Sequence, residues 1–208
     1  MKWTQIPLGA IQTNCYILEN ESKDALIIDP GDEYEKIVSF IEENSLKPLA
    51  VLLTHAHFDH IGAVDQVRSK WKIPAYLHIN ESDWLQDPEK NGSAHFPIVE
   101  NYHCKPSEEI IGSEQEMSIG SFRFKVLETP GHSPGSVSFY FKDKGVIFSG
   151  DALFYGSIGR TDLYGGDQEV LLESIHQKLL LLPEETIVAP GHGFETTIKN
   201  EKDTNPFL

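Results

Sequence analysis

The sequence predicts an α/β protein of the α+β kind, in which two β-sheets pack together with helices outside, a four-layer sandwich. Apolar and polar residues alternate in neighbouring segments of both halves of the chain, as in antiparallel pairs of strands. Segments with helical spacing lie between and after these pairs. No repeat, low-complexity tract or linker divides the 208 residues, so we expect a single domain over residues 1–208.

The N-terminal half contains the segments that predict the first sheet and its helices. A helix is expected over 33–45, where Ile37, Phe40 and Ile41 share one face, and another over Gly62–Trp71. Strands are expected at 14–20, 25–31, 49–53 and 73–79.

The C-terminal half begins after the least patterned part of the chain, Asp87–Glu109, which predicts a long loop, a candidate lid. A helix is expected over Gln168–Leu182. Strands are expected within 121–131, 136–151 and 186–192. The alternative architecture is an ordinary doubly wound α/β domain, and the hairpin-like pairs of strands count against it.

The composition limits the class of partner. Apolar residues make up 39% of the chain, enough for a full core, and 32 acidic against 17 scattered basic residues give a net charge of −15. Such a charge repels nucleic acid and anionic lipid, so we expect neither as a partner.

Residues 1–17 lack both a charged start and a continuous apolar run, which favours a cytoplasmic location. Cys15 and Cys104 are expected to be buried thiols rather than a disulfide.

The stretch THAHFDH, residues 54–60, holds three of the nine histidines. Its His-x-His-x-Asp-His pattern is expected by chance in only about one such chain in a thousand. His55 and His57 lie two apart in extended chain, so both side chains point the same way and reach one ion. Asp59 and His60 lie beyond the turn, where they address a second ion. Asp59 also stands where a cap for the next helix is expected.

Three further apolar strands end in a turn that carries a histidine or an aspartate. These residues are His132, Asp151 and His192, and each follows a glycine. Side chains just past strand ends converge at one edge of a sheet, so four strand ends together supply five histidines and two aspartates. The other histidines, His78, His95, His103 and His176, are interpreted as ordinary surface or core residues.

This set of side chains predicts two divalent metal ions. Imidazole and carboxylate suit zinc, iron or manganese, whereas calcium requires six to eight oxygens. Seven ligands are too many for one tetrahedral ion. Two ions roughly 3.5 to 4 Å apart, sharing Asp151 and a water, use all seven and leave positions open for a substrate. We expect zinc first, with iron or manganese as alternatives.

The motif THAHFDH with His132, Asp151 and His192 resembles the metallo-β-lactamase superfamily over nearly the whole chain. The resemblance implies an αββα sandwich. It also implies that His55, His57 and His132 hold one ion, that Asp59, His60 and His192 hold the other, and that Asp151 bridges them. The motif is specific for fold and metal, and uninformative about the substrate.

Several branches of this superfamily differ from the chain. Common zinc β-lactamases carry cysteine in place of Asp151, flavo-diiron proteins carry glutamate in place of His57, and lactonases carry tyrosine in place of Phe154. The stretch GDALFYGSIGRTDLYGGD and the terminal NPFL look most like glyoxalase II-like hydrolases and their persulfide dioxygenase relatives. Full glyoxalase II enzymes continue into a helical glutathione-binding domain, whereas only sixteen residues follow His192.

The sequence therefore predicts a dinuclear metal-dependent hydrolase of small-molecule thioesters such as S-lactoyl thiols. A hydroxide that bridges the two metals attacks the carbonyl carbon, and Asp59 orients it. Alternatives are a mononuclear iron persulfide dioxygenase using His55, His132 and Asp151, a lactonase or other ester hydrolase, and a binding module without catalysis. The oligomeric state stays open.

Three further residues are candidates for supporting roles. Asp29 is expected either to accept a hydrogen bond from a ligand histidine or to act as a turn or N-cap residue. Arg160 is expected either to pair with Asp162 and shape the loop after Asp151 or to bind substrate. Tyr155 is a candidate to line the pocket, with plain packing as the alternative.

Overall fold

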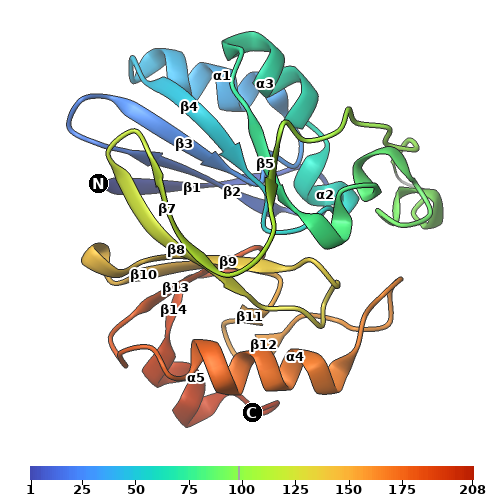
Figure 1. The fold of residues 1–208 in the computed structure, drawn as a ribbon, viewed down its shortest axis with the longest axis vertical. Coiled ribbons are helices and arrows are strands. Elements are labelled where there is room, and N and C mark those ends of the chain that lie inside the picture. Colours follow the sequence, from blue (N-terminus) through green and yellow to red (C-terminus); the bar gives the residue numbers. More distant parts are fainter. Residues whose placement is uncertain (98) are drawn as a thin grey trace.

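The computed structural model describes residues 1–97 and 99–208 and contains two six-stranded sheets that face each other (Figure 1). The first sheet has the strand order β1-β2-β3-β4-β5-β6. Its strands are β1 (Lys2–Leu8), β2 (Thr13–Glu19), β3 (Asp24–Ile28), β4 (Lys47–Leu52), β5 (Ala75–His78) and β6 (Glu109–Ile111).

The second sheet has the order β14-β13-β10-β9-β8-β7, and a two-stranded hairpin lies beside it. The hairpin consists of β11 (Leu153–Phe154) and β12 (Ser157–Ile158). The strands of the sheet are β7 (Gln115–Ile119), β8 (Phe122–Glu128), β9 (Val137–Phe141), β10 (Val146–Gly150), β13 (Ile187–Pro190) and β14 (Thr196–Thr197).

Antiparallel pairing occurs in both sheets, as predicted, but the first sheet is mixed. The first three strands pair antiparallel, whereas β3 with β4, β4 with β5 and β5 with β6 pair parallel. Parallel neighbours need crossover connections, and here α1 and α3 supply two of them. The predicted pairing of the strands at 14–20 and 25–31 is therefore confirmed, and the parallel pairing of the later strands was not predicted.

Helices cover the outer faces of both sheets, which makes four layers (Figure 1). The helices α1 (Tyr34–Glu43) and α3 (Val64–Trp71) lie outside the first sheet, and α4 (Gln168–Ser174) and α5 (Ile198–Thr204) lie outside the second. The shorter helical segments are α2 (Phe58–Ile61), η1 (Ile79–Glu81), η2 (Trp84–Gln86), η3 (Ser93–His95), η4 (Lys142–Lys144) and η5 (Ile175–Leu179). The predicted helix over Gln168–Leu182 is thus α4 followed by the π-helical turn η5, which ends at Leu179.

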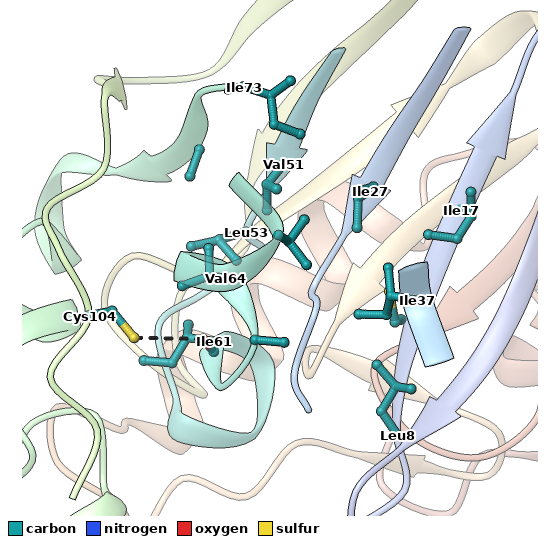
Figure 2. Close-up of a cluster of buried hydrophobic side chains, with 14 of the residues drawn as sticks. Leu8, Ile17, Ile27, Ile37, Val51, Leu53, Ile61, Val64, Ile73 and Cys104 are labelled. Atoms are coloured by element: carbon teal, nitrogen blue, oxygen red, sulfur yellow. Dashed lines mark hydrogen bonds between the residues drawn. The ribbon is translucent and has the colours of Figure 1, made fainter. Parts of the chain in front are cut away.

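Successive side chains along a strand point to opposite faces of the sheet, so the core consists of separate layers. In β2, Tyr16 and Leu18 point between the sheets, whereas Cys15 and Ile17 point toward the helices. Figure 2 shows the layer between the first sheet and its helices, where Ile17, Ile27 and Val51 of the strands meet Ile37 and Val64 of α1 and α3. Both faces of the first sheet are therefore buried.

The segment Asp87–Glu109 is a long loop, as predicted, with the short helical turn η3 within it, and residue 98 lies outside the described residues. Asn91 is fully buried and donates to the backbone carbonyls of Trp84 and Tyr102. Cys104 is a buried free thiol, as predicted, and so is Cys15. The segment packs against the first sheet's helical layer through Cys104, whose sulfur lies 3.7 Å from the Ile61 carbonyl (Figure 2).

Among the described residues, no helix combines the length and the apolar character needed to cross a bilayer.

The aromatic side chains between the sheets provide a test of the core. Phe148 is fully buried and contacts Trp3, Tyr16 and Phe141 edge to face. We expect Phe148→Ala to lower the free energy of unfolding of the metal-free protein by about 3–5 kcal/mol, because it leaves a cavity. Urea denaturation followed by circular dichroism measures this loss. Phe194→Ala is the matched control: that ring is 80% exposed, so the change should stay within about 0.5 kcal/mol. Equal losses in both variants would contradict this assignment of the core.

Candidate metal centre

Strand direction brings the predicted ligands to one edge of the sandwich. The strands β8 and β10 are both antiparallel to β9, and β13 is parallel to β10, so their carboxyl ends share an edge. His132, Asp151 and His192 follow these three strands, and THAHFDH follows β4 of the other sheet. The structure brings all seven residues together.

The first group consists of three buried imidazoles, those of His55, His57 and His132. The Nε2 atom of His132 lies 2.8 Å from Nδ1 of His57 and 3.2 Å from Nε2 of His55. Burial lowers the pKa of all three side chains, that of His57 to about 3. The imidazoles are therefore neutral at physiological pH, which is the form that binds a metal ion.

The second group joins Asp59, His60 and His192, with Asp151 beside them. His192 Nε2 lies 3.1 Å from Asp59 Oδ2 and 3.4 Å from Asp151 Oδ2. His60 Nε2 lies 3.4 Å from Asp151 Oδ1. The other Asp151 oxygen, Oδ2, is 3.7 Å from His132 Nε2, so this carboxylate lies between the two groups.

The electrostatics of the second group differ from those of the first. Burial disfavours the charged form of His60, but the carboxylates of Asp59, Asp151 and Asp29 outweigh it and raise its pKa. Burial likewise opposes charge on His192, whereas hydrogen bonds to Asp151 and Asp59 raise its pKa to about 9. The two histidines in turn hold the pKa of Asp59 and Asp151 below the usual range, against the effect of burial. The carboxylates thus favour positive charge at this position.

The chemistry of these side chains fits divalent metal. Two buried atoms without a hydrogen-bond partner among the described residues, His60 Nε2 and Asp151 Oδ1, lie 3.4 Å apart within the second group. Buried polar atoms normally have a partner, so such a concentration points to an ion at this place. Neutral imidazoles and carboxylates are the ligands that zinc, iron and manganese accept.

Neighbouring groups fix the orientation of the ligand histidines. His132 donates through Nδ1–H to the Arg160 carbonyl oxygen at 2.7 Å, which leaves its Nε2 lone pair facing the group. His60 Nδ1 lies 2.9 Å from Asp29 Oδ2, and Asp29 also accepts from the Thr54 backbone and hydroxyl. Asp29 therefore occupies the position expected of a carboxylate that fixes a ligand tautomer.

Asp59 does not cap a helix. The helix α2 begins at Phe58, with His57 in the N-cap position, so Asp59 already lies in the first turn. Its carboxylate accepts a hydrogen bond from the Thr13 hydroxyl at 2.7 Å and faces His192 instead of backbone amides. The capping role expected for Asp59 was wrong because the helix begins two residues earlier than this role requires.

Glycine allows close approach at the fourth strand end. A Cβ atom on Gly191 would lie 2.0 Å from Asp151 Oδ1 and 2.9 Å from Cε1 of His60. The backbone before His192 therefore passes directly over the other ligands, which only glycine permits.

A cavity of about 120 Å³ opens onto this centre. The residues that line it include the apolar side chains Ile11, Phe58, Phe96 and Leu163, and Arg160. Arg160 forms a two-pronged ion pair with Asp162 at 2.7 and 2.8 Å, as the pairing hypothesis expected.

Tyr155 lies outside this cavity and its side chain is 60% exposed. The residue forms the two-residue tip of the β11–β12 hairpin with Gly156, so its side chain points to solvent. The prediction that Tyr155 lines the pocket was wrong for this reason. The neighbouring Phe154 faces the centre instead, with its ring centroid 6.0 Å from that of His192.

The remaining histidines are separate from the centre among the described residues. His78 is buried and lies 3.0 Å from a Glu128 oxygen, while His95, His103 and His176 are exposed. Sequence reasoning assigned no role to Thr13, Thr54 or Glu81, which hold the ligand loops in place. Only Thr54, inside the motif, carried a signal that pointed to the site.

Comparison with protein families matches residues 8–192 to the metallo-beta-lactamase superfamily. The chain belongs to this superfamily. It is 56% identical to "Probable metallo-hydrolase YqgX" of Bacillus subtilis (strain 168), covering 100% of this chain and 98% of the relative. It is 38% identical to "Hydroxyacylglutathione hydrolase GloC" of Haemophilus influenzae, covering 98% and 96%. The chain is therefore a metallo-hydrolase of the metallo-β-lactamase superfamily.

Solved structures agree with this assignment. The crystal structure of the BLEG-1 B3 metallo-beta-lactamase matches with a TM-score of 0.97 and 55% identity, covering 100% of this chain and 99% of that one. The structure of TTHA1623 in a di-iron-bound form matches with a TM-score of 0.86 and 42% identity, covering 99% and 100%. The predicted metallo-β-lactamase fold is confirmed, and divalent metal is the cofactor that the family and the cluster indicate.

Proton release tests the electrostatics of the second group. The raised pKa values favour the protonated forms of His60 and His192 in the metal-free protein. Metal must displace these protons, so we expect a net release of protons on metal binding, and tighter binding as the pH rises. Calorimetric titration with Zn²⁺ in two buffers of different ionisation enthalpy measures the release. His176→Ala, at an exposed position, should leave it unchanged, and zinc binding without proton release would contradict the prediction.

Proposed function

We propose that this chain is a dinuclear metal-dependent hydrolase of thioesters such as S-lactoyl thiols. The observation that carries the proposal is the position of Asp151, whose Oδ2 atom lies 3.7 Å from His132 Nε2 of the first group and 3.4 Å from His192 Nε2 of the second. This arrangement suits two ions that share one carboxylate. The zinc expected first from the ligand set is part of the proposal, with iron and manganese as alternatives.

Two bound divalent ions would supply hydroxide at neutral pH, since coordination lowers the pKa of water from 15.7 to about 7, and would polarise the substrate carbonyl. His55, His57 and His132 would hold one ion, Asp59, His60 and His192 the other, and Asp151 both. Asp59, which contacts Thr13 and His192 in the second group, would orient the attacking water. Asp29 keeps His60 in the tautomer that presents Nε2.

The cavity supports a small acyl substrate. Its volume of about 120 Å³ accommodates a short acyl chain against Ile11, Phe58, Phe96 and Leu163. Arg160, more than half exposed at this cavity, would meet a carboxylate or hydroxyl of the substrate while it stays paired with Asp162. The name of the Haemophilus relative, a hydroxyacylglutathione hydrolase, supports a thioester of a hydroxy acid.

Hydrolysis of β-lactams is a second candidate function. The solved relative named a B3 metallo-beta-lactamase is 55% identical to this chain and favours it. The two functions share the centre and differ in substrate. Iron-dependent persulfide oxidation stays an alternative for which oxygen uptake is the test.

The test is a substrate panel on zinc-loaded and iron-loaded protein. We expect release of free thiol from S-lactoyl thioesters, little turnover of a chromogenic cephalosporin, and no oxygen uptake with a low-molecular-weight persulfide. Turnover of the cephalosporin alone, or oxygen uptake alone, would overturn the thioester proposal in favour of the corresponding alternative.

Substitution of ligands tests the roles within the proposed centre. Loss of a residue that only hydrogen-bonds to a metal ligand lowers activity roughly 10- to 100-fold. Asp151→Ala and His132→Ala each remove a ligand itself, so we expect a larger loss of thioester turnover. Circular dichroism checks that the variants stay folded. His95→Ala removes an exposed histidine and should keep full activity. Full activity in a folded Asp151→Ala variant would reject the assignment.

A further inference from the structure

A buried carboxylate, that of Glu81, links the two loops that carry the first ligand group. Glu81 ends η1 and its side chain is fully buried. One oxygen accepts a hydrogen bond from the Ala56 backbone N–H at 2.6 Å. The other oxygen accepts from the Ser133 hydroxyl at 2.5 Å and from the Gly135 backbone N–H at 2.8 Å.

The partners of Glu81 are the chain neighbours of the ligands. Ala56 lies between His55 and His57, and Ser133 directly follows His132. The Ala56 loop leaves the first sheet and the Ser133 loop leaves the second, so this one carboxylate crosses between the two sheets. One backbone hydrogen bond, from the Val137 N–H to the Thr54 carbonyl at 2.8 Å, also joins these loops.

The environment of Glu81 argues against a role in charge pairing. Among the described residues, no lysine or arginine forms an ion pair with Glu81. Burial raises the pKa of Glu81 to about 7, although its three hydrogen bonds oppose this rise. Burial of a carboxylate without a paired cation costs free energy. Packing alone therefore does not explain why Glu81 lies between the two loops.

The packing around Glu81 is equally specific. A Cβ atom on Gly135 would lie 2.9 Å from Cγ of Glu81 and 3.1 Å from Oε1. The loop that carries His132 can therefore approach this carboxylate only with glycine at position 135.

We propose that Glu81 is a positioning residue that sets the spacing of the His55, His57 and His132 imidazoles and so controls metal affinity at that group and not at the other. The His132 Nε2 atom, on one loop, lies 2.8 Å from His57 Nδ1 and 3.2 Å from His55 Nε2 on the other loop. Glu81 fixes the separation of these two loops. The second group depends on different contacts, from Thr13 and Asp29. This inference rests on the proposed metal centre and not on the identity of the substrate.

Glu81→Gln is the informative substitution, since it keeps the size of the side chain. Whichever way the amide lies, its NH₂ faces a backbone N–H, either that of Ala56 or that of Gly135. One link between the loops is therefore lost. Gly135→Ala disturbs the same contact by pushing the carboxylate away, and it serves as an independent second variant.

Glu201→Gln is the matched control. Glu201 is another fully buried carboxylate, and it accepts hydrogen bonds from the Gly156 N–H, the Thr196 hydroxyl and the Asn205 amide, away from the first group. Urea denaturation of the metal-free variants compares the stability losses of the two substitutions.

The experiment measures the dissociation constant of Zn²⁺ by competition with a chromophoric chelator in two backgrounds. In the His192→Ala background the second group binds Zn²⁺ weakly, so the dissociation constant reports on the first group. In the His132→Ala background the first group binds weakly, and the dissociation constant reports on the second. We expect Glu81→Gln to raise the dissociation constant about 10- to 100-fold in the His192→Ala background and to leave it unchanged in the His132→Ala background. Gly135→Ala should act in the same direction, and Glu201→Gln should have no effect in either.

An equal change in both backgrounds, no change in either, or the same change with Glu201→Gln would overturn the role of Glu81. Thioester turnover by the parent protein is measured separately, so a failure of the substrate assignment is distinguishable from a failure of this inference.

Discussion

The convergence of four strand ends at one edge of the sandwich is the constraint on which the centre depends. Parallel directions of β8, β10 and β13 place His132, Asp151 and His192 together, and the end of β4 adds THAHFDH from the opposite sheet. The site therefore exists only while the two sheets stay packed. The aromatic side chains around Phe148 and the hydrogen bonds of Glu81 both hold the two sheets together.

Burial and charge give the two ligand groups different characters. Desolvation keeps His55, His57 and His132 neutral, as a metal requires, whereas the carboxylates around His60 and His192 attract positive charge. The second group therefore binds protons when no ion is present.

The sequence predicted the sandwich and the seven residues of the centre because their signals are local. A His-x-His-x-Asp-His string and glycine–ligand pairs after apolar strands can be recognised without tertiary information. The edge strand β1 and the C-terminal helix α5 were missed, since their partly exposed residues follow no clear period. The exposure of Tyr155 follows from a local two-residue hairpin turn with Gly156, which was not recognised in the sequence. The link through Glu81 depends on contacts between distant segments, and a lone glutamate after a strand has no pattern that reveals it.

The metal content of the folded chain tests the proposed centre most directly. Protein saturated with zinc, freed of excess metal and analysed by mass spectrometry should contain about two ions per chain, and His192→Ala about one. A single ion in the unmodified chain, with no loss on substitution of His192, would contradict a centre in which Asp151 joins two groups of ligands.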